Sequence, residues 1–268
     1  MTHDLDAALH LTPLGGHRFA GATHPAYANM VGPYGGITAA ALLNAALLHP
    51  ARLGSPIALT VNFAAPLAEG DFEIDAQPLR TNRSTQHWGL QLHQAGAVAA
   101  TGTAVFAARR DTWSATEAVP PAGMPAAASL PRASTEGRPH WTQRYDMRFA
   151  AGEAPEFGTA DRPHSHNRLW VRDEPPRPLD FAALAALCDC FFPRIFLRRS
   201  RLTPIGTVSL TSYFHADARL LAAQGTRHLL GTARALNFRH GYFDQSAEVW
   251  SDDGQLLAST HQMVYYRE

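Results

Sequence analysis

The chain has 268 residues, of which 46% are hydrophobic and 17% charged, which is enough for a sizeable core in one large domain or two ordinary ones. Lys plus Arg and Asp plus Glu both number 23, so the formal net charge is zero. No overall field therefore draws the chain to nucleic acid or to an acidic membrane. With no signal-peptide pattern and no run of ~20 apolar residues, we expect a cytoplasmic protein without a membrane partner.

The first half of the chain predicts a helix followed by an antiparallel meander. Residues 34–48, YGGITAAALLNAALL, are apolar on nearly every side and are typical of a buried helix. Residues 56–80 contain two β-rich runs around the turn signal Glu69-Gly70-Asp71, and residues 85–110 contain two more around Gly96. Residues 111–140 are rich in Pro, Ala and Ser without apolar periodicity, which predicts a linker.

The second half predicts the same order of elements after two further strands, at 142–150 and 167–174. Residues 179–196 predict a helix, with Asp180 as its N-cap and Pro193 bending or ending it. Within it, Cys188 and Cys190 are too close for an easy disulfide, so we expect reduced, buried thiols. Four strands follow, at 206–218, 227–238, 244–252 and 254–267, and Asp253-Gly254 predicts a hairpin turn.

The two halves align with each other, which indicates an internal repeat. Phe63 aligns with Phe214 at an offset of 151 residues, and Arg109 aligns with Arg267 at an offset of 158. A loop insertion between the two anchors accounts for the difference. We therefore predict an α+β chain made of two copies of one unit, each a central helix wrapped by an antiparallel sheet. The predicted boundaries are residues 1–110 for the first unit, 111–140 for the linker and 141–268 for the second unit.

Five segments, in order, resemble the bacterial acyl-CoA thioesterase II family and its thioesterase-superfamily relatives. They are GPYGGITAAALLNAA (32–46), VNFAAPLAEGDFEIDAQPLRTNRS (61–84), RLWVRDE (168–174), ALCDCFFP (186–193) and DDGQLLASTHQ (252–262). The resemblance implies a double hotdog fold. It also implies hydrolysis of acyl-CoA by a water activated by an Asp on the second helix, helped by a Gln and by a hydroxyl or amide residue on later strands.

By this resemblance the candidate catalytic residues are Asp189, Gln262 and Asn237, where Asn237 departs from a family hydroxyl. Thioester hydrolysis needs a base for the water and donors for the oxyanion. The backbone N–H groups of Gly35 and Gly36, at an unobstructed helix start, suit the second role. For the phosphates of coenzyme A, the best candidates are Arg198, Arg199 and Arg201. We expect neither a cofactor nor a metal site.

Other interpretations remain open at this level. Asp189 could instead be a partly exposed helix residue paired with Arg194. A non-catalytic acyl-CoA binding module is an alternative function that the Asn at position 237 favours. A hotdog enoyl-CoA hydratase is a weaker alternative, because no His follows Asp189 closely. No G-x-S-x-G, H-E-x-x-H or Walker pattern is present. Association into a homodimer or a higher oligomer is possible, and the sequence gives no preferred acyl chain length.

Overall fold

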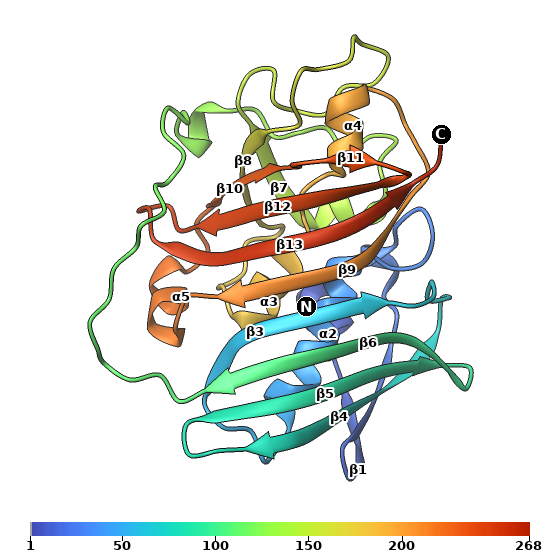
Figure 1. Ribbon diagram of the computed structural model, residues 1–268, viewed down its shortest axis with the longest axis vertical. Helices are drawn as coiled ribbons and strands as arrows, with labels where there is room; N and C mark the ends of the chain where they lie inside the picture. Colours follow the sequence, from blue (N-terminus) through green and yellow to red (C-terminus); the bar gives the residue numbers. More distant parts are fainter. Residues whose placement is uncertain (1) are drawn as a thin grey trace.

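One antiparallel sheet of 13 strands passes through both halves of this computed structural model, which describes residues 2–268 (Figure 1). In order of pairing, the strands are β1 (Thr12–Gly15), β2 (Arg18–Ala22), β4 (Asp71–Thr81), β5 (Thr85–Gln94), β6 (Ala97–Ala107), β3 (Ser55–Phe63), β9 (Ile205–Phe214), β13 (Leu256–Tyr266), β12 (Tyr242–Trp250), β10 (Leu229–Arg234), β8 (Asn167–Asp173) and β7 (Tyr145–Phe149). The short strand β11 (Phe238–Arg239) pairs with β12. The helices are α1 (Asp4–Ala8), α2 (Gly35–Leu48), α3 (Phe181–Leu187), α4 (Arg194–Arg199) and α5 (Ala218–Gln224).

Two four-stranded segments of the sheet, called the two units below, meet where β3 pairs with β9. Strands β4-β5-β6-β3 on one side of the junction correspond to β10-β12-β13-β9 on the other. Phe63 pairs with Ala100 in the first unit, and Phe214 pairs with Ala258 in the second. Across the junction, Thr60 pairs with Thr211, 151 residues later, and their hydroxyl oxygens are 3.1 Å apart. This pairing joins two residues at the offset of 151 expected from the sequence. The strand order on the two sides is related by an approximate two-fold axis between these two threonines.

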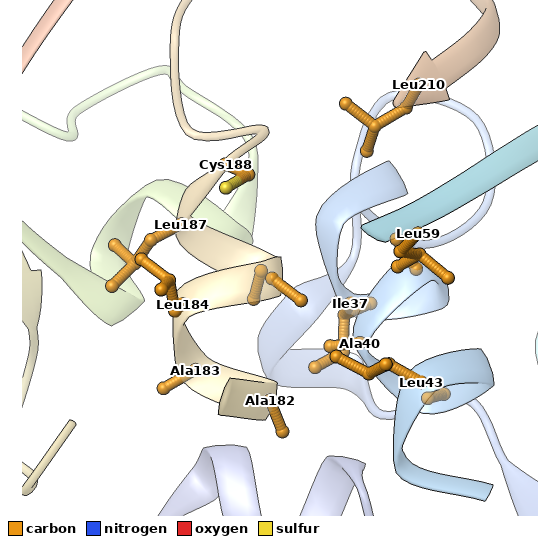
Figure 2. Close-up of a cluster of buried hydrophobic side chains, with 14 of the residues drawn as sticks. Ile37, Ala40, Leu43, Leu59, Ala182, Ala183, Leu184, Leu187, Cys188 and Leu210 are labelled. Carbon is orange, nitrogen blue, oxygen red and sulfur yellow. The ribbon is translucent and has the colours of Figure 1, made fainter. Parts of the chain in front are cut away.

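Helices α2 and α3 pack against each other behind the sheet (Figure 1). Helix α2 also contacts strands β3, β4 and β5, so it is covered on nearly every side, which explains why its sequence is apolar all round. Figure 2 shows the resulting core, in which small residues such as Ala40 and Ala182 alternate with leucines from both helices and from the sheet. This close packing fixes the start of α2 against the end of α3.

The second predicted helix, residues 179–196, is two helices rather than one. Asp180 caps α3 as expected, since its side chain accepts a hydrogen bond of 2.8 Å from the Ala183 N–H. The helix ends at Leu187, and a turn through Cys188 and Asp189 leads to Pro193, which is the N-cap of α4. Proline lacks the N–H that a continuous helix would need, so the chain restarts there. Asp189 therefore lies in a turn and not within a helix.

Some elements carry too little periodicity to be predicted. The first hairpin, β1 and β2, extends the sheet at one edge, and the short helices α1 and α5 lie outside the repeat. Residues 111–140 contain no strand; they hold one short 3-10 helix, Ala127–Ser129, and a second, His140–Arg144, begins at their end. The domain boundaries at 110 and 140 stay a prediction. No helix in residues 2–268 has the length and apolar character needed to cross a membrane.

Candidate functional site

The site is built where the N-terminus of α2 meets the C-terminus of α3. Tyr34 is the N-cap of α2, and its buried hydroxyl donates a hydrogen bond of 2.7 Å to the Ala186 carbonyl of α3. A β-carbon at Gly36 would lie 2.5 Å from that same carbonyl oxygen and 2.5 Å from the Tyr34 ring. Only glycine permits this approach. The close contact directs the positive end of the α2 dipole toward the turn that follows α3.

Asp189, in that turn, and Gln262, on β13, form the polar centre of the site. The Gln262 Nε2 donates a hydrogen bond of 2.7 Å to the Asp189 Oδ1. On the other side, the Oδ2 lies 2.8 Å from where a β-carbon of Gly35 would be, so an alanine there would displace the carboxylate. The Gly36 backbone also hydrogen-bonds to the carboxyl group. The carboxylate is thus held between a helix start and a strand.

The environment tunes the ionisation of Asp189 to neutral pH. The pKa of its carboxyl group is raised to about 7. Burial raises this pKa, and the hydrogen bonds from Gln262 and the Gly36 backbone offset part of that rise. Burial disfavours the charged form, and donors to the carboxylate favour it. A carboxyl group balanced in this way is available as a base at neutral pH, and such a balance is common at catalytic sites.

Arg194 is not the partner of Asp189, so that alternative from the sequence is wrong. The side chain is fully buried and donates hydrogen bonds to neutral oxygens only, among them the Gln245 Oε1 at 3.0 Å and the Asn167 Oδ1 at 2.6 Å. Burial lowers the pKa of its guanidinium to about 9. Its role is structural, because it fastens the start of α4 to strands β8 and β12.

A cavity of about 370 Å³ has Gly35 in its wall, and Gly35 is also the residue that packs against the Asp189 carboxylate; Asp189 and Gln262 themselves do not line this cavity. It lies between the two units, since Phe63 at the end of β3 and Thr207 near the start of β9 both line it. None of the described residues that line it carries a charged side chain. These residues are Asn29, Met30, Val31, Pro33, Gly35, Thr38, Phe63, Ala64, Ala65, Pro66, Leu67, Ala99, Ala100, Ile205, Gly206, Thr207 and Tyr265. Its size falls in the range of small-molecule sites.

The structure does not bring Asn237 to this centre. Asn237 lies in an exposed loop before β11, and its backbone N–H donates a hydrogen bond of 2.8 Å to the Asp244 Oδ1. A hydroxyl that the sequence analysis missed, Thr207, lies on the cavity wall instead. Thr207 pairs with Val264, which shares the inward face of β13 with Gln262. Simple alternation along 205–214 would place position 207 on the face opposite to Leu210 and Phe214. The register shift between Met263 and Val264 brings Thr207 opposite Val264 instead, so the sequence alone carried no signal for it.

The three predicted phosphate-binding arginines lie at and just after the end of α4. Arg199 forms ion pairs with Asp161 at 2.8 Å and Glu268 at 2.9 Å, and Arg201 pairs with Glu268 at 2.5 Å. The Arg198 guanidinium donates to the Arg162 carbonyl. In the sequence all three come a few residues before Ile205, which lines the cavity. Each of them, however, is already hydrogen-bonded or ion-paired within the protein. Their role toward phosphate therefore stays a prediction.

The symmetry-related position in the other half holds no equivalent centre. At offsets of 151 and 158 residues, Asp189 corresponds to Thr38 and Gln262 to Ala104. The cavity mouth corresponds to the region where Arg109 donates hydrogen bonds to the carbonyls of Phe214 at 2.6 Å, His215 at 3.2 Å and Pro56 at 3.3 Å. The Arg109 side chain thus occupies this position.

Comparisons with known proteins give a family match and a fold. Residues 24–107 match the family model for the acyl-CoA thioesterase N-terminal domain, and residues 116–266 match that for the acyl-CoA thioesterase C-terminal domain. The chain is 51% identical to a hot dog fold protein of unknown function from Alicyclobacillus acidocaldarius, with a TM-score of 0.94 over 100% of this chain and 99% of that one. The fold of the chain is therefore the hot dog fold.

More distant structures share the fold. A putative thioesterase II from Thermobifida fusca YX is 20% identical, with a TM-score of 0.82 over 98% of this chain and 97% of that one. The acyl-CoA thioesterase II TesB2 from Mycobacterium marinum is 18% identical, with a TM-score of 0.76 over 98% of each chain. No curated protein matches the chain.

The two glycines at the start of α2 should differ in their tolerance of alanine. In Gly36→Ala the new methyl meets the Ala186 carbonyl and the Tyr34 ring, so we expect a loss of folding stability of about 2 kcal/mol or more. In Gly35→Ala the methyl meets mainly the Asp189 side chain, which can rotate away, so the loss should be smaller. Chemical denaturation of both variants measures this, and a larger loss for Gly35→Ala would contradict the described packing.

Proposed function

The chain belongs to the acyl-CoA thioesterase family, and we propose that it hydrolyses acyl-CoA to a free acid and coenzyme A with Asp189 as the base that activates water. The observation that carries this proposal is the Asp189 carboxyl group, held by Gln262 and by the start of α2, where Gly35 lines an uncharged cavity. In keeping with the family, we further propose that the two similar units form a double hotdog.

The proposed reaction needs only groups of this chain and one water. Asp189 accepts a proton as the water oxygen bonds to the thioester carbonyl carbon, and Gln262 and Thr207 orient that water. The negative charge that develops on the carbonyl oxygen is stabilised at the α2 N-terminus. There the Gly36 N–H is engaged by Asp189, so the Gly35 N–H is the proposed oxyanion donor. The carbon–sulfur bond then breaks, and the proton on Asp189 passes to the departing thiolate.

The two alternative functions are less well supported. The binding module was suggested by an Asn in place of the family hydroxyl, and Thr207 on the cavity wall supplies a hydroxyl. The hydratase would need a His beside Asp189, and the side chain hydrogen-bonded to Asp189 in the described residues is that of Gln262. Cytoplasmic location, association into oligomers and the binding of coenzyme A phosphates by Arg198, Arg199 and Arg201 remain part of the proposal.

Replacing the base tests the proposal directly. We expect Asp189→Asn to lower kcat/KM for acyl-CoA substrates by about 100-fold or more, because a general base contributes rate factors of this order. The measurement is release of free thiol from saturated acyl-CoAs of graded length. The control is Asp217→Asn, since Asp217 caps the peripheral helix α5 and asparagine is also a good N-cap. Equal activity in Asp189→Asn and the wild type would rule out the proposed base.

The pH dependence should report the ionisation of Asp189. The base is the carboxylate, so kcat/KM should rise with pH and level off above an apparent pKa of about 7. Gln262→Leu removes a donor that favours the carboxylate, so the rising limb should move to higher pH. Rate profiles from pH 5 to 9 for both proteins measure this. A limb that stays in place or moves to lower pH in Gln262→Leu would contradict the role of this hydrogen bond.

A further inference from the structure

We propose that Leu67 limits the length of the acyl group by closing the inner end of the substrate cavity. The protein would then prefer uncharged acyl groups of up to about eight carbons. This inference rests on the proposed function, because it places the acyl group in the cavity beside Asp189. It assigns a specificity-determining role to a side chain outside the catalytic centre.

A second, smaller cavity, called the inner cavity below, adjoins the first, which is called the outer cavity, and shares wall residues with it. It measures about 20 Å³ and extends between α2 and the sheet, where Ile37, Ala41, Phe72 and Leu92 line it. The two cavities share three wall residues, Pro33, Thr38 and Leu67. Pro33 and Thr38 belong to the start of α2 and its approach, whereas Leu67 comes from the loop between β3 and β4. The Leu67 side chain, 7% exposed, is therefore part of the partition between the two spaces.

The partition is held in place from both sides. Gly32 has a φ of +66° and packs so closely that a β-carbon there would collide with the Leu67 carbonyl oxygen. On the other side, the Gln94 amide accepts a hydrogen bond of 2.7 Å from the Ala68 N–H and donates one of 3.0 Å to the Ala68 carbonyl. These contacts fix the backbone at Leu67 and Ala68, and the Leu67 side chain itself is packed in the main hydrophobic core. The barrier is thus a fixed wall, and a longer acyl chain must stop there.

The size and lining of the outer cavity define the substrate class. A volume of about 370 Å³ corresponds to about twelve groups the size of a water molecule. The carbonyl carbon and oxygen, the sulfur and the methylene bonded to the sulfur take about four of these, which leaves room for about eight carbons. The absence of charged side chains among the described lining residues favours a neutral acyl group over one that ends in a carboxylate or an ammonium.

Shortening Leu67 should lengthen the acyl chain that fits. We would measure the Kd of S-alkyl-CoA thioethers, which cannot be hydrolysed, from 2 to 16 carbons by calorimetry. In the wild type, affinity should rise about fourfold per methylene and stop rising at about eight carbons. In Leu67→Ala the rise should continue for two or more further carbons. In Leu67→Val, which loses less packing, the extension should be smaller.

Two further variants make the result specific. Leu67→Ala combined with Ala41→Leu fills the inner cavity, because Ala41 lines that cavity and not the outer one, and should return the limit toward that of the wild type. Leu221→Ala, on the distant helix α5, is a buried leucine whose loss should lower stability without moving the limit.

An unchanged limit in folded Leu67→Ala and Leu67→Val overturns the inference, as does a failure of the wild type to bind any thioether. Because the thioethers are not substrates, these results do not depend on turnover. If the proposed hydrolysis failed instead, wild-type protein would release no thiol from acyl-CoA while the length limit and its shift in Leu67→Ala persisted.

Discussion

The burial of one carboxyl group between a helix start and a strand is the constraint on which the site depends. An isolated carboxylate in this position would be too costly, and a fully neutral acid would be useless as a base. The Gln262 amide and the start of α2 offset part of the cost of burial and keep the carboxyl group near half-ionisation at neutral pH. The two glycines of α2 are needed because any larger residue would separate these groups.

The candidate site lies at the junction between the two units of the sheet. The cavity forms where β3 of one unit meets β9 of the other, so each unit supplies one wall. The approximate two-fold axis at Thr60 and Thr211 would generate a second site, yet its polar positions have become Thr38 and Ala104. There the Arg109 guanidinium binds three carbonyl groups.

Much of this arrangement could be predicted from the sequence because it depends on local patterns. The alignment of Phe63 with Phe214 gave the repeat offset, and the glycines before an apolar run gave the helix start. Asp189 and Gln262, 73 residues apart, could be named only through the family resemblance. The break after Leu187 was not predicted, because apolar residues continue through Phe192 and conceal it. Thr207 was missed because its direction depends on pairing with β13, a long-range property that neighbouring residues do not reveal.

The most direct test of the account is the pKa of Asp189 itself, measured by NMR titration of a protein labelled with ¹³C in its aspartate carboxyl groups. The Asp189 signal is the one absent from Asp189→Asn. The account predicts a midpoint near pH 7, about three units above an ordinary aspartate. A midpoint near pH 4 would mean that the carboxyl group is not buried as described and that it has no special capacity to activate water.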